Sequence, residues 1–427
     1  MSCVTTNPCS GALVQETAEA VARHSYGKLV AYLASRSGNV AAAEDALSEA
    51  FAAALEDWPV KGCPANPDAW LLTVARRKLI DMARRRKNEA PAAEYDLEAE
   101  TAAISTEEDI PDRRLGLMFA CAHPAIDAGI RAPLILQAVL GFDAGRIASA
   151  FLISPAAMGQ RLVRGKTKIR QAGIPLKIPS REEMPERLET VLDAIYAAFS
   201  EGWLDAAGTD TARRDLAEEA IYLCRLVAGM LPNEPEALGL LALMLYAEAR
   251  RRARRSSDGS YVPLAEQDVS VWDQERIDEA ERALSRASGA GIIGRYQLEA
   301  AIQSAHVARR REGVSNWAAV VRLYDGLMAL TGSPVAAINR AVALAQLEGA
   351  SAGLAALNLA SADPRVREYQ PYWAARADLL ARNDSRDEAR AAYEIAIGLE
   401  RDASVRQALE QRRAALLEVV SLRAELA

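Results

Sequence analysis

Histidines, aromatic residues and closely spaced cysteines are scarce in this chain of 427 residues. It has three histidines, without the HExxH spacing of a zinc enzyme, and aromatics make up 5% of the sequence. The five cysteines are odd in number, far apart and never in a CxxC pair. These absences argue against a metal site, a disulfide framework and a histidine-based catalytic centre, so we expect no cofactor. A reducing cytoplasm is the compartment that fits this use of cysteine.

Long hydrophobic runs are missing as well. No stretch approaches the about 18 consecutive apolar residues of a membrane-spanning helix, and the N-terminus lacks a charged region followed by an apolar run. We therefore expect a soluble protein with no membrane partner. Strand-like runs of Val, Ile and Thr are absent while Ala, Leu, Arg and Glu abound, which predicts an all-α fold. At this length two or three domains are expected.

Positive charge is concentrated in two segments of an otherwise acidic chain. The formal net charge is −7, from 51 Lys and Arg against 58 Asp and Glu. Residues 76–87 hold seven bases and one acid, residues 155–170 hold five bases and no acid, and residues 94–112 hold eight acids and no base. Because nonspecific phosphate binding favours a basic chain, any DNA contact has to come from the two basic segments.

The first basic segment lies on a helix predicted over residues 69–86. Its apolar positions recur at helical spacing on one face: Leu71, Ala75, Leu79 and Met82. Arg77 and Arg84 share a different face. Two prolines and a glycine in residues 61–67 break the helical pattern before it, and Asp68 is placed to cap the new helix. One side of this helix is therefore expected to be core and another basic.

Residues 143–170 predict a helix-turn-helix. A short helix, a tight turn at 151–153 and a second helix capped by Ser154 with Pro155 in its first turn fit that motif, although a corner of a helical bundle gives a similar pattern. In the second helix the apolar face is formed by Met158, Leu162 and Ile169. On the opposite face, the side chains near the N-terminus are short, and those that follow can donate or accept hydrogen bonds. Reading base edges in a groove requires this arrangement, and the basic residues at either side would contact phosphates. We predict that the residues contacting duplex DNA are Ser154, Ala156, Gln160, Arg161, Arg164, Lys166 and Lys168.

The C-terminal half, residues 185–427, is predicted to be a run of helices with small residues where they cross. Residues 372–399 predict a tetratricopeptide-type helical hairpin and residues 317–347 a second one, without fixing the number of repeats. An irregular insertion over residues 250–273 begins with five arginines. We expect a solvated helix end there, with a nucleic-acid patch as the less favoured alternative.

The motifs together resemble a known family. Residues 43–86 resemble region two, and residues 113–172 region four, of extracytoplasmic-function sigma factors, a class of bacterial RNA polymerase initiation factors. Stretches such as FSEGW at 199–203 and QDVSVWD at 267–273 resemble the subgroup whose sigma core is fused to a large tetratricopeptide-like extension. The domains that the resemblance implies are 10–88 for region two, 89–112 for an acidic linker, 113–173 for region four and 185–427 for the extension.

The resemblance also implies roles for particular residues. Asp45, Glu49 and Phe51 match the helix that docks on core RNA polymerase. The loop over 58–67 and the helix after it match the element that opens the minus-ten promoter region, through Asn66, Trp70, Arg76, Arg77, Arg84 and Arg85. A shaped loop beside a cationic helix suits capture of an unstacked base. The helix-turn-helix would read the minus-thirty-five element as duplex.

We therefore predict a noncatalytic sigma factor that binds core RNA polymerase and promoter DNA, in the cytoplasm. The linker would mimic nucleic acid in the polymerase channel, and the C-terminal array would regulate the factor, in a direction that the sequence leaves open, through a protein partner or ligand. Candidate lining residues are Asp268, Trp272, Asp273, Tyr296 and Gln297, although buried structural networks explain these equally well. A helix-turn-helix regulator with a repeat-type sensor is the alternative, and it leaves residues 43–86 unexplained. An enzyme is less favoured, because no nucleophile–base pair or phosphate loop is present.

Overall fold

The structure is a computed structural model that describes residues 25–87, 112–151, 153–180, 182–203, 211–256, 259–308, 313, 316–400 and 402–425. The all-α prediction is confirmed: the described residues contain no β-strand, only an isolated antiparallel bridge between Arg255 and Tyr261. The chain divides into two compact units, residues 1–202 with 215–220, and residues 203–214 with 221–427. The predicted acidic linker lies, apart from Asp112, outside the described residues.

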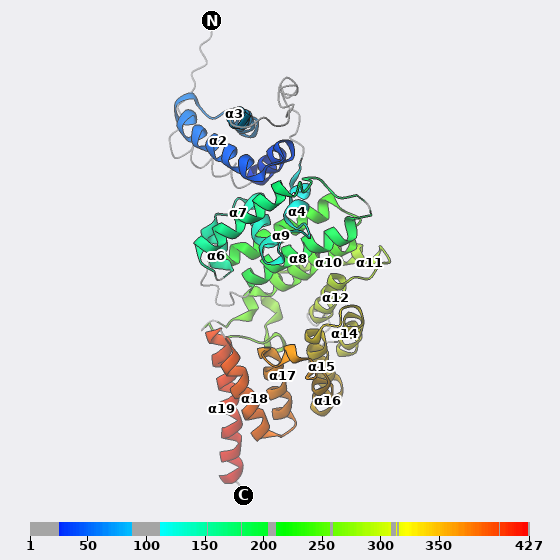
Figure 1. Cartoon of the computed structure of the whole chain (residues 1–427). Helices are drawn as coiled ribbons and strands as arrows, with labels where there is room; N and C mark the ends of the chain where they lie inside the picture. Colours follow the sequence, from blue (N-terminus) through cyan, green and yellow to red (C-terminus); the bar gives the residue numbers. More distant parts are fainter. Residues whose placement is uncertain are drawn as a thin grey trace. The chain divides into compact units, whose positions relative to one another are not determined.

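The first unit begins with a helix over residues 25–37, followed by α2 (Val40–Lys61) and α3 (Pro67–Lys87) (Figure 1). The predicted break holds, because α2 ends at Lys61 and the chain turns at Gly62, whose φ of 84° lies in the left-handed region that favours glycine. The prediction of a loop from residue 58 is wrong, since α2 continues through Trp58 and Pro59.

The start of α3 also differs from the prediction. The helix begins at Pro67, where a proline is tolerated because the first helical N–H has no partner within the helix. Asn66 rather than Asp68 is the cap, and its Oδ1 accepts a hydrogen bond from the Ala69 N–H at 3.0 Å. Asp68 is already in the first turn, where it accepts a hydrogen bond from the Ser25 hydroxyl at 2.7 Å.

The rest of the first unit is a small helical bundle. Its helices are α4 (Arg114–Cys121), α5 (Ala128–Leu140), α6 (Ala144–Ala150), α7 (Pro155–Gln171) and α8 (Met184–Trp203). Every residue of α4 from Leu115 to Cys121 is buried, so α4 is the centre of the bundle. α8, which the sequence analysis assigns to the C-terminal region, groups with this unit up to Gly202. The Arg187 guanidinium of α8 donates to the Phe119 carbonyl of α4 at 2.8 Å.

The second unit is a series of paired helices (Figure 1). The helices before the insertion are α9 (Thr211–Met230), whose residues 215–220 group with the first unit, and α10 (Pro235–Ala249). Within the insertion there are only short turns, η1 (Arg251–Arg254), η2 (Leu264–Glu266) and η3 (Val269–Val271). The later elements are α11 (Gln274–Ser288), α12 (Arg295–Val307), α14 (Trp317–Thr331), α15 (Pro334–Glu348), α16 (Ala350–Ala360), η4 (Pro364–Val366), α17 (Gln370–Arg382), α18 (Arg386–Leu399) and α19 (Ala403–Glu425).

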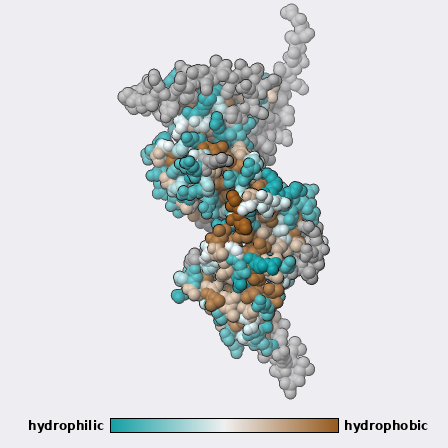
Figure 2. Space-filling view, turned by 90° about the vertical axis from the view of Figure 1, so that its right-hand side faces the viewer, coloured by the Kyte–Doolittle hydropathy of each residue, from teal (hydrophilic) through white to brown (hydrophobic). Residues whose placement is uncertain are grey.

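Both predicted helical hairpins occur in this unit, as α14 with α15 and α17 with α18. Small residues permit close approach between neighbouring helices. A Cβ added to Gly353 of α16 would meet the Ala345 side chain of α15 at 2.5 Å. Figure 2 shows hydrophobic side chains gathered on one face at the level of α12 to α16. The large apolar residues that are exposed on α14 to α16 are Leu330, Val335, Leu347 and Leu359.

Candidate nucleic-acid interface

The helix α3 has the two faces that the sequence predicts. Leu71, Ala75 and Leu79 are at most 5% exposed and pack in the core, and Met82 is half-buried. The side chains of Arg77 and Arg84 are exposed. The helix therefore offers a cationic surface to solvent while its opposite side is fixed by burial. The side chain of Arg85, also predicted to bind DNA, lies outside the described residues.

Two of the predicted minus-ten residues are held by the helices beside α3. The Arg76 guanidinium donates to the Tyr32 hydroxyl at 3.1 Å and lies 5.5 Å from the centre of that ring. The Trp70 ring packs edge-to-face on Trp58, with 5.5 Å between the ring centres. Trp58 is 1% exposed whereas Trp70 is only half-buried. Trp70 is thus a rigidly supported aromatic side chain beside the cationic face, an arrangement suited to stacking on an unpaired base.

The three predicted polymerase contacts lie on α2, where Asp45 and Glu49 share one face and Phe51 is on another. Asp45 and Glu49 are exposed, one helical turn apart, and Phe51 is half-buried. Glu49 also pairs with Lys78 of α3 at 2.8 Å, but the two side chains are 53% and 44% exposed. An ion pair so exposed to water contributes little to stability, so Glu49 can leave Lys78 for another basic partner.

The helix-turn-helix consists of α6 and α7. As predicted, Ser154 caps α7, and its hydroxyl accepts from the Ala157 N–H at 3.3 Å. The predicted core face is confirmed, because Met158, Leu162 and Ile169 are at most 2% exposed. Of the predicted DNA contacts, the exposed ones are Ser154, Ala156, Gln160, Arg161, Arg164 and Lys168. The first turn of α7 is therefore fixed by its cap, and the polar side chains that follow are exposed to solvent.

Lys166, the remaining predicted DNA contact, is directed elsewhere in this structure. Its ammonium lies 2.6 Å from Glu44 Oε2 on α2, and the two side chains are 13% and 10% exposed. Burial raises the pKa of Glu44 above its usual value, against the lowering effect of Lys166. The other oxygen, Glu44 Oε1, has no hydrogen-bond partner among the described residues. The pair therefore joins α7, the predicted recognition helix, to α2, which carries the predicted polymerase contacts, and leaves one of the two Glu44 oxygens without a hydrogen bond.

A second close contact within the first unit joins the 25–37 helix to α5. A Cβ added to Gly27 would overlap the backbone carbonyl of Val139 in α5, so only glycine permits this approach. Beside it, the Tyr26 ring covers Gly141, which ends α5 in the left-handed conformation. Burial, reinforced by the charges of Glu44 and Asp45, raises the pKa of Tyr26.

The contacts made by Tyr32, Glu44 and Gly27 within the first unit were not predicted from the sequence. Glu44 did leave a signal, because it lies three residues before the buried Leu47, on the apolar side of its helix. A carboxylate on an apolar stripe needs a partner, but only the tertiary structure identifies Lys166 as that partner.

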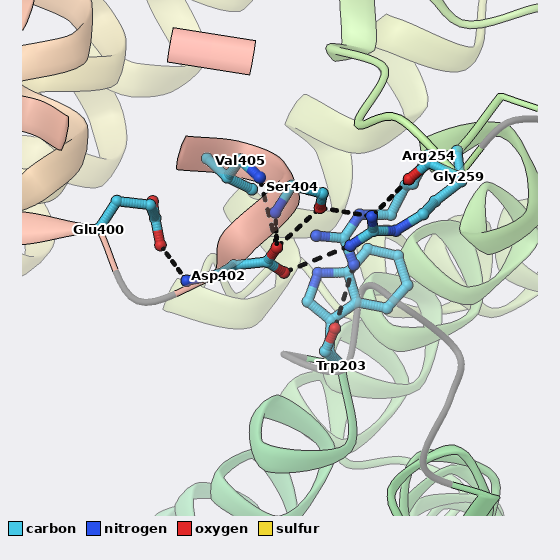
Figure 3. A network of polar contacts seen from close by, with 8 residues as sticks. Trp203, Arg254, Gly259, Glu400, Asp402, Ser404 and Val405 are labelled. Carbon is cyan, nitrogen blue, oxygen red and sulfur yellow. Dashed lines mark hydrogen bonds and ion pairs between the residues drawn. The ribbon is translucent and has the colours of Figure 1, made fainter. Parts of the chain in front are cut away.

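Two of the five arginines that begin the insertion are bound within the second unit, whereas Arg252 of the same run is exposed (Figure 3). Arg254 lies 4.3 Å from the centre of the Trp203 ring and donates to its carbonyl at 3.0 Å. Arg255 donates to the Ser404 hydroxyl and lies 3.3 Å from Asp402 at the start of α19. For these two arginines, the expectations of a solvated helix end and of a nucleic-acid patch are therefore both wrong. Their contacts hold the insertion in place within the second unit.

The candidate groove residues divide into buried and exposed side chains. Trp272 in the insertion and Tyr296 on α12 are buried at 3% and 2% exposure, and the Gln297 N–H donates to Glu236 Oε1 at 3.1 Å. Asp268 and Asp273 are exposed and accept hydrogen bonds from N–H groups two and three residues ahead, as caps do. The buried-network interpretation therefore fits Trp272, Tyr296 and Gln297 but not the two exposed aspartates.

Among the described residues, no group of three or more His, Cys, Asp and Glu side chains is placed to hold a metal ion. No described helix combines the length and the apolar character needed to span a bilayer.

Comparison with known proteins supports the first domain directly. Residues 21–89 match the family model for sigma-70 region 2, and residues 187–288 match DUF6596, a family of unknown function. The "Uncharacterized protein R00370" of Rhizobium meliloti (strain 1021) is 38% identical over 373 residues, which span 86% of this chain and 88% of that protein. No solved structure matches the chain. The chain therefore carries a sigma-70 region 2 domain at residues 21–89 and belongs to the same protein family as R00370.

Proposed function

We propose that this protein is a sigma factor of the extracytoplasmic-function type, which binds core RNA polymerase and directs it to promoters. The observation that carries the proposal is the match of residues 21–89 to sigma-70 region 2, together with the exposed arginines of α3 on that same domain. Region 2 would dock on the polymerase through Asp45, Glu49 and Phe51. It would hold the opened minus-ten strand through the α3 face beside Trp70.

The helix-turn-helix would contribute the second promoter contact. A recognition helix reads the major groove through the residues near its N-terminus, and α7 has exposed Gln160 and Arg164 there. Lys166 can reach a phosphate only after it leaves Glu44. In this proposal the arrangement described above is a closed form, and promoter binding requires α7 to separate from α2.

The second unit would be a built-in regulator, formed as a tetratricopeptide-like array. Paired helices with small residues at their crossings support this assignment. The unit would regulate the factor by favouring either the closed or the open form of the first unit.

Transcription by purified core polymerase on genomic DNA, with and without this protein, tests the proposal. Sequencing the 5′ ends of the transcripts should reveal start sites that depend on the protein. The double variant Arg77→Ala and Arg84→Ala should lose promoter melting, measured by permanganate reactivity, while it keeps polymerase binding. Arg282→Ala, which removes an exposed arginine of α11, is the matched control and should transcribe normally. Promoter binding without core polymerase, and no protein-dependent start sites, would instead favour a helix-turn-helix regulator.

A further inference from the structure

The second unit contains a cavity of about 260 Å³ beside the insertion. Its walls come from the end of α12, from α14 and α15, and from η2 of the insertion. The lining residues are Leu264, Ala265, His306, Trp317, Val320, Tyr324, Asn339, Val342, Ala343 and Gln346. The volume lies just below the roughly 300–1,000 Å³ of sites for drug-sized ligands, so a molecule of one or two rings fits.

Aromatic side chains and buried apolar residues form the floor and one wall. The His306 and Trp317 rings meet edge-to-face, with 5.6 Å between their centres. Val320 and Ala343 are at most 2% exposed and belong to the hydrophobic cluster under the cavity. Faces and edges of aromatic rings are complementary to another flat ring.

Three polar side chains converge on the same space. Asn339 and Gln346 are exposed on one side of α15, two turns apart, which is about 10.5 Å along the axis. Tyr324 lies on α14, and burial raises the pKa of its phenol to about 12, so it stays a hydrogen-bond donor at neutral pH. Within the described part of the chain, no protein group hydrogen-bonds to these three side chains. They are therefore available to a bound molecule.

The cavity carries no acid, lysine or arginine in its lining. The charges nearest to Tyr324 belong to Glu299 and Arg250. Glu299 pairs with Arg295 at 2.9 Å, and Arg250 donates to the Gln303 side chain at 2.6 Å. Because these charges have their own partners, a charged ligand would lose its hydration without gaining a counter-ion.

The wall supplied by the insertion is anchored at its start. Arg255 is bound to Asp402 and Ser404 at the start of α19, and the Arg255 and Asp402 side chains are 15% and 26% exposed. Glu266, directly after Leu264 and Ala265, accepts from Arg412 of α19 at 2.8 Å, but these two side chains are 62% and 39% exposed, so this pair contributes little. The anchored start of the insertion lowers the ordering cost of binding.

We propose that this cavity is a binding site for a small neutral molecule with one flat ring and a hydrogen-bonding edge. The ring would lie against Trp317 and His306, and its polar edge would face the Tyr324 hydroxyl and the Asn339 amide. The proposal concerns binding alone and does not depend on the sigma function.

A charge series on one ring tests the site in the full-length protein. Benzamide, benzoate and benzamidine have the same ring and similar size but are neutral, anionic and cationic. Titration calorimetry and saturation-transfer NMR should show saturable binding of benzamide in the millimolar range. At pH 8.5, where an ordinary imidazole such as that of the lining His306 is neutral, benzoate and benzamidine should bind at least about tenfold more weakly, because neither gains a counter-ion.

Variants assign the binding to this cavity. Val342→Phe should fill it and abolish benzamide binding, and Asn339→Leu, at an exposed position that does not disturb the core, should weaken it. Tyr324→Phe should weaken binding about fivefold through one lost hydrogen bond. The matched control is Tyr393→Phe, which removes a buried phenol in a separate hydrophobic cluster of α17 to α19 and should leave binding unchanged.

Three results would overturn the proposal: no saturable benzamide binding, a charged probe that binds as tightly as benzamide, or binding that is unchanged in both Val342→Phe and Asn339→Leu. Because no polymerase is present, failure here leaves the transcription result intact, and failure of protein-dependent transcription leaves the binding result intact.

Discussion

Replacing Glu44 by Gln should open the first unit. The Glu44 and Lys166 side chains are 10% and 13% exposed and their charged atoms are 2.6 Å apart. The variant leaves the Lys166 ammonium without an opposite charge, which for a buried pair costs about 3–5 kcal/mol. Separation of α7 from α2 relieves that cost, because Lys166 then reaches water. At about 1.36 kcal/mol per decade, the docked population falls roughly 100- to 5,000-fold relative to the open one.

Two measurements should move together in Glu44→Gln. Hydrogen exchange should accelerate at the facing amides of α2 and α7, and affinity for duplex DNA should rise because Lys166 is released. Lys166→Met should also speed hydrogen exchange, because it leaves the Glu44 carboxylate buried without an opposite charge. It should lower DNA affinity, and the slope of log K against log salt concentration should fall by about 1, because one phosphate contact is lost. The double variant should restore slow exchange, because no charge is then left unpaired.

The control is Glu49→Gln, which removes the exposed pair with Lys78. An exposed pair contributes about 0–1 kcal/mol, so exchange at α7 should not change. The reasoning is refuted if Glu44→Gln leaves hydrogen exchange and DNA affinity at their wild-type values, or if the two single variants change DNA affinity in the same direction.

Three further variants test other parts of the structure. Gly27→Leu should force the 25–37 helix off α5 by steric overlap, and therefore raise DNA affinity as Glu44→Gln does, whereas Gly229→Ala, a helical glycine with open space around it, should not. Ser154→Ala should lose about 1 kcal/mol from the lost cap, measured by urea unfolding, while Ser154→Asp should keep that stability but weaken DNA binding by repelling phosphate. Asp402→Ala should lower the free energy of unfolding by about 1 kcal/mol, because it removes the partner of Arg255. Amide hydrogen exchange over residues 254–262 should accelerate, and unchanged exchange there would show that this contact does not hold the insertion.

Much of the local structure follows from sequence because its causes are local. The break at residues 61–67 follows from proline and glycine, and the buried face of α7 follows from a 3.6-residue period. Asn66 and Asp68 show the limit of this reasoning: both can cap a helix, and which one does depends on where the first turn begins. The loop expected from residue 58 fails for a similar reason, since burial of Trp58 keeps α2 helical through Pro59.

The candidate site was predictable as a set of residues but not as a set of partners. Charge pattern selected Arg77, Arg84 and the polar face of α7, and these side chains are exposed where DNA could reach them. Nothing in the pattern separated Lys166 from its neighbours, although its ammonium is bound to Glu44, 122 positions away. The roles of these residues in polymerase and promoter binding stay predictions.

The all-α fold, the helix break at residues 61–67 and the two basic segments follow from the order of residues alone, because periodicity, backbone restriction and charge act over a few residues. The pairing of Glu44 with Lys166, the binding of the insertion arginines to Trp203 and Asp402, and the meeting of Tyr324, Asn339 and Gln346 around one cavity appear only in the folded chain. Such contacts join residues distant along the chain, and their energies depend on burial and distance, which exist only once the chain has folded.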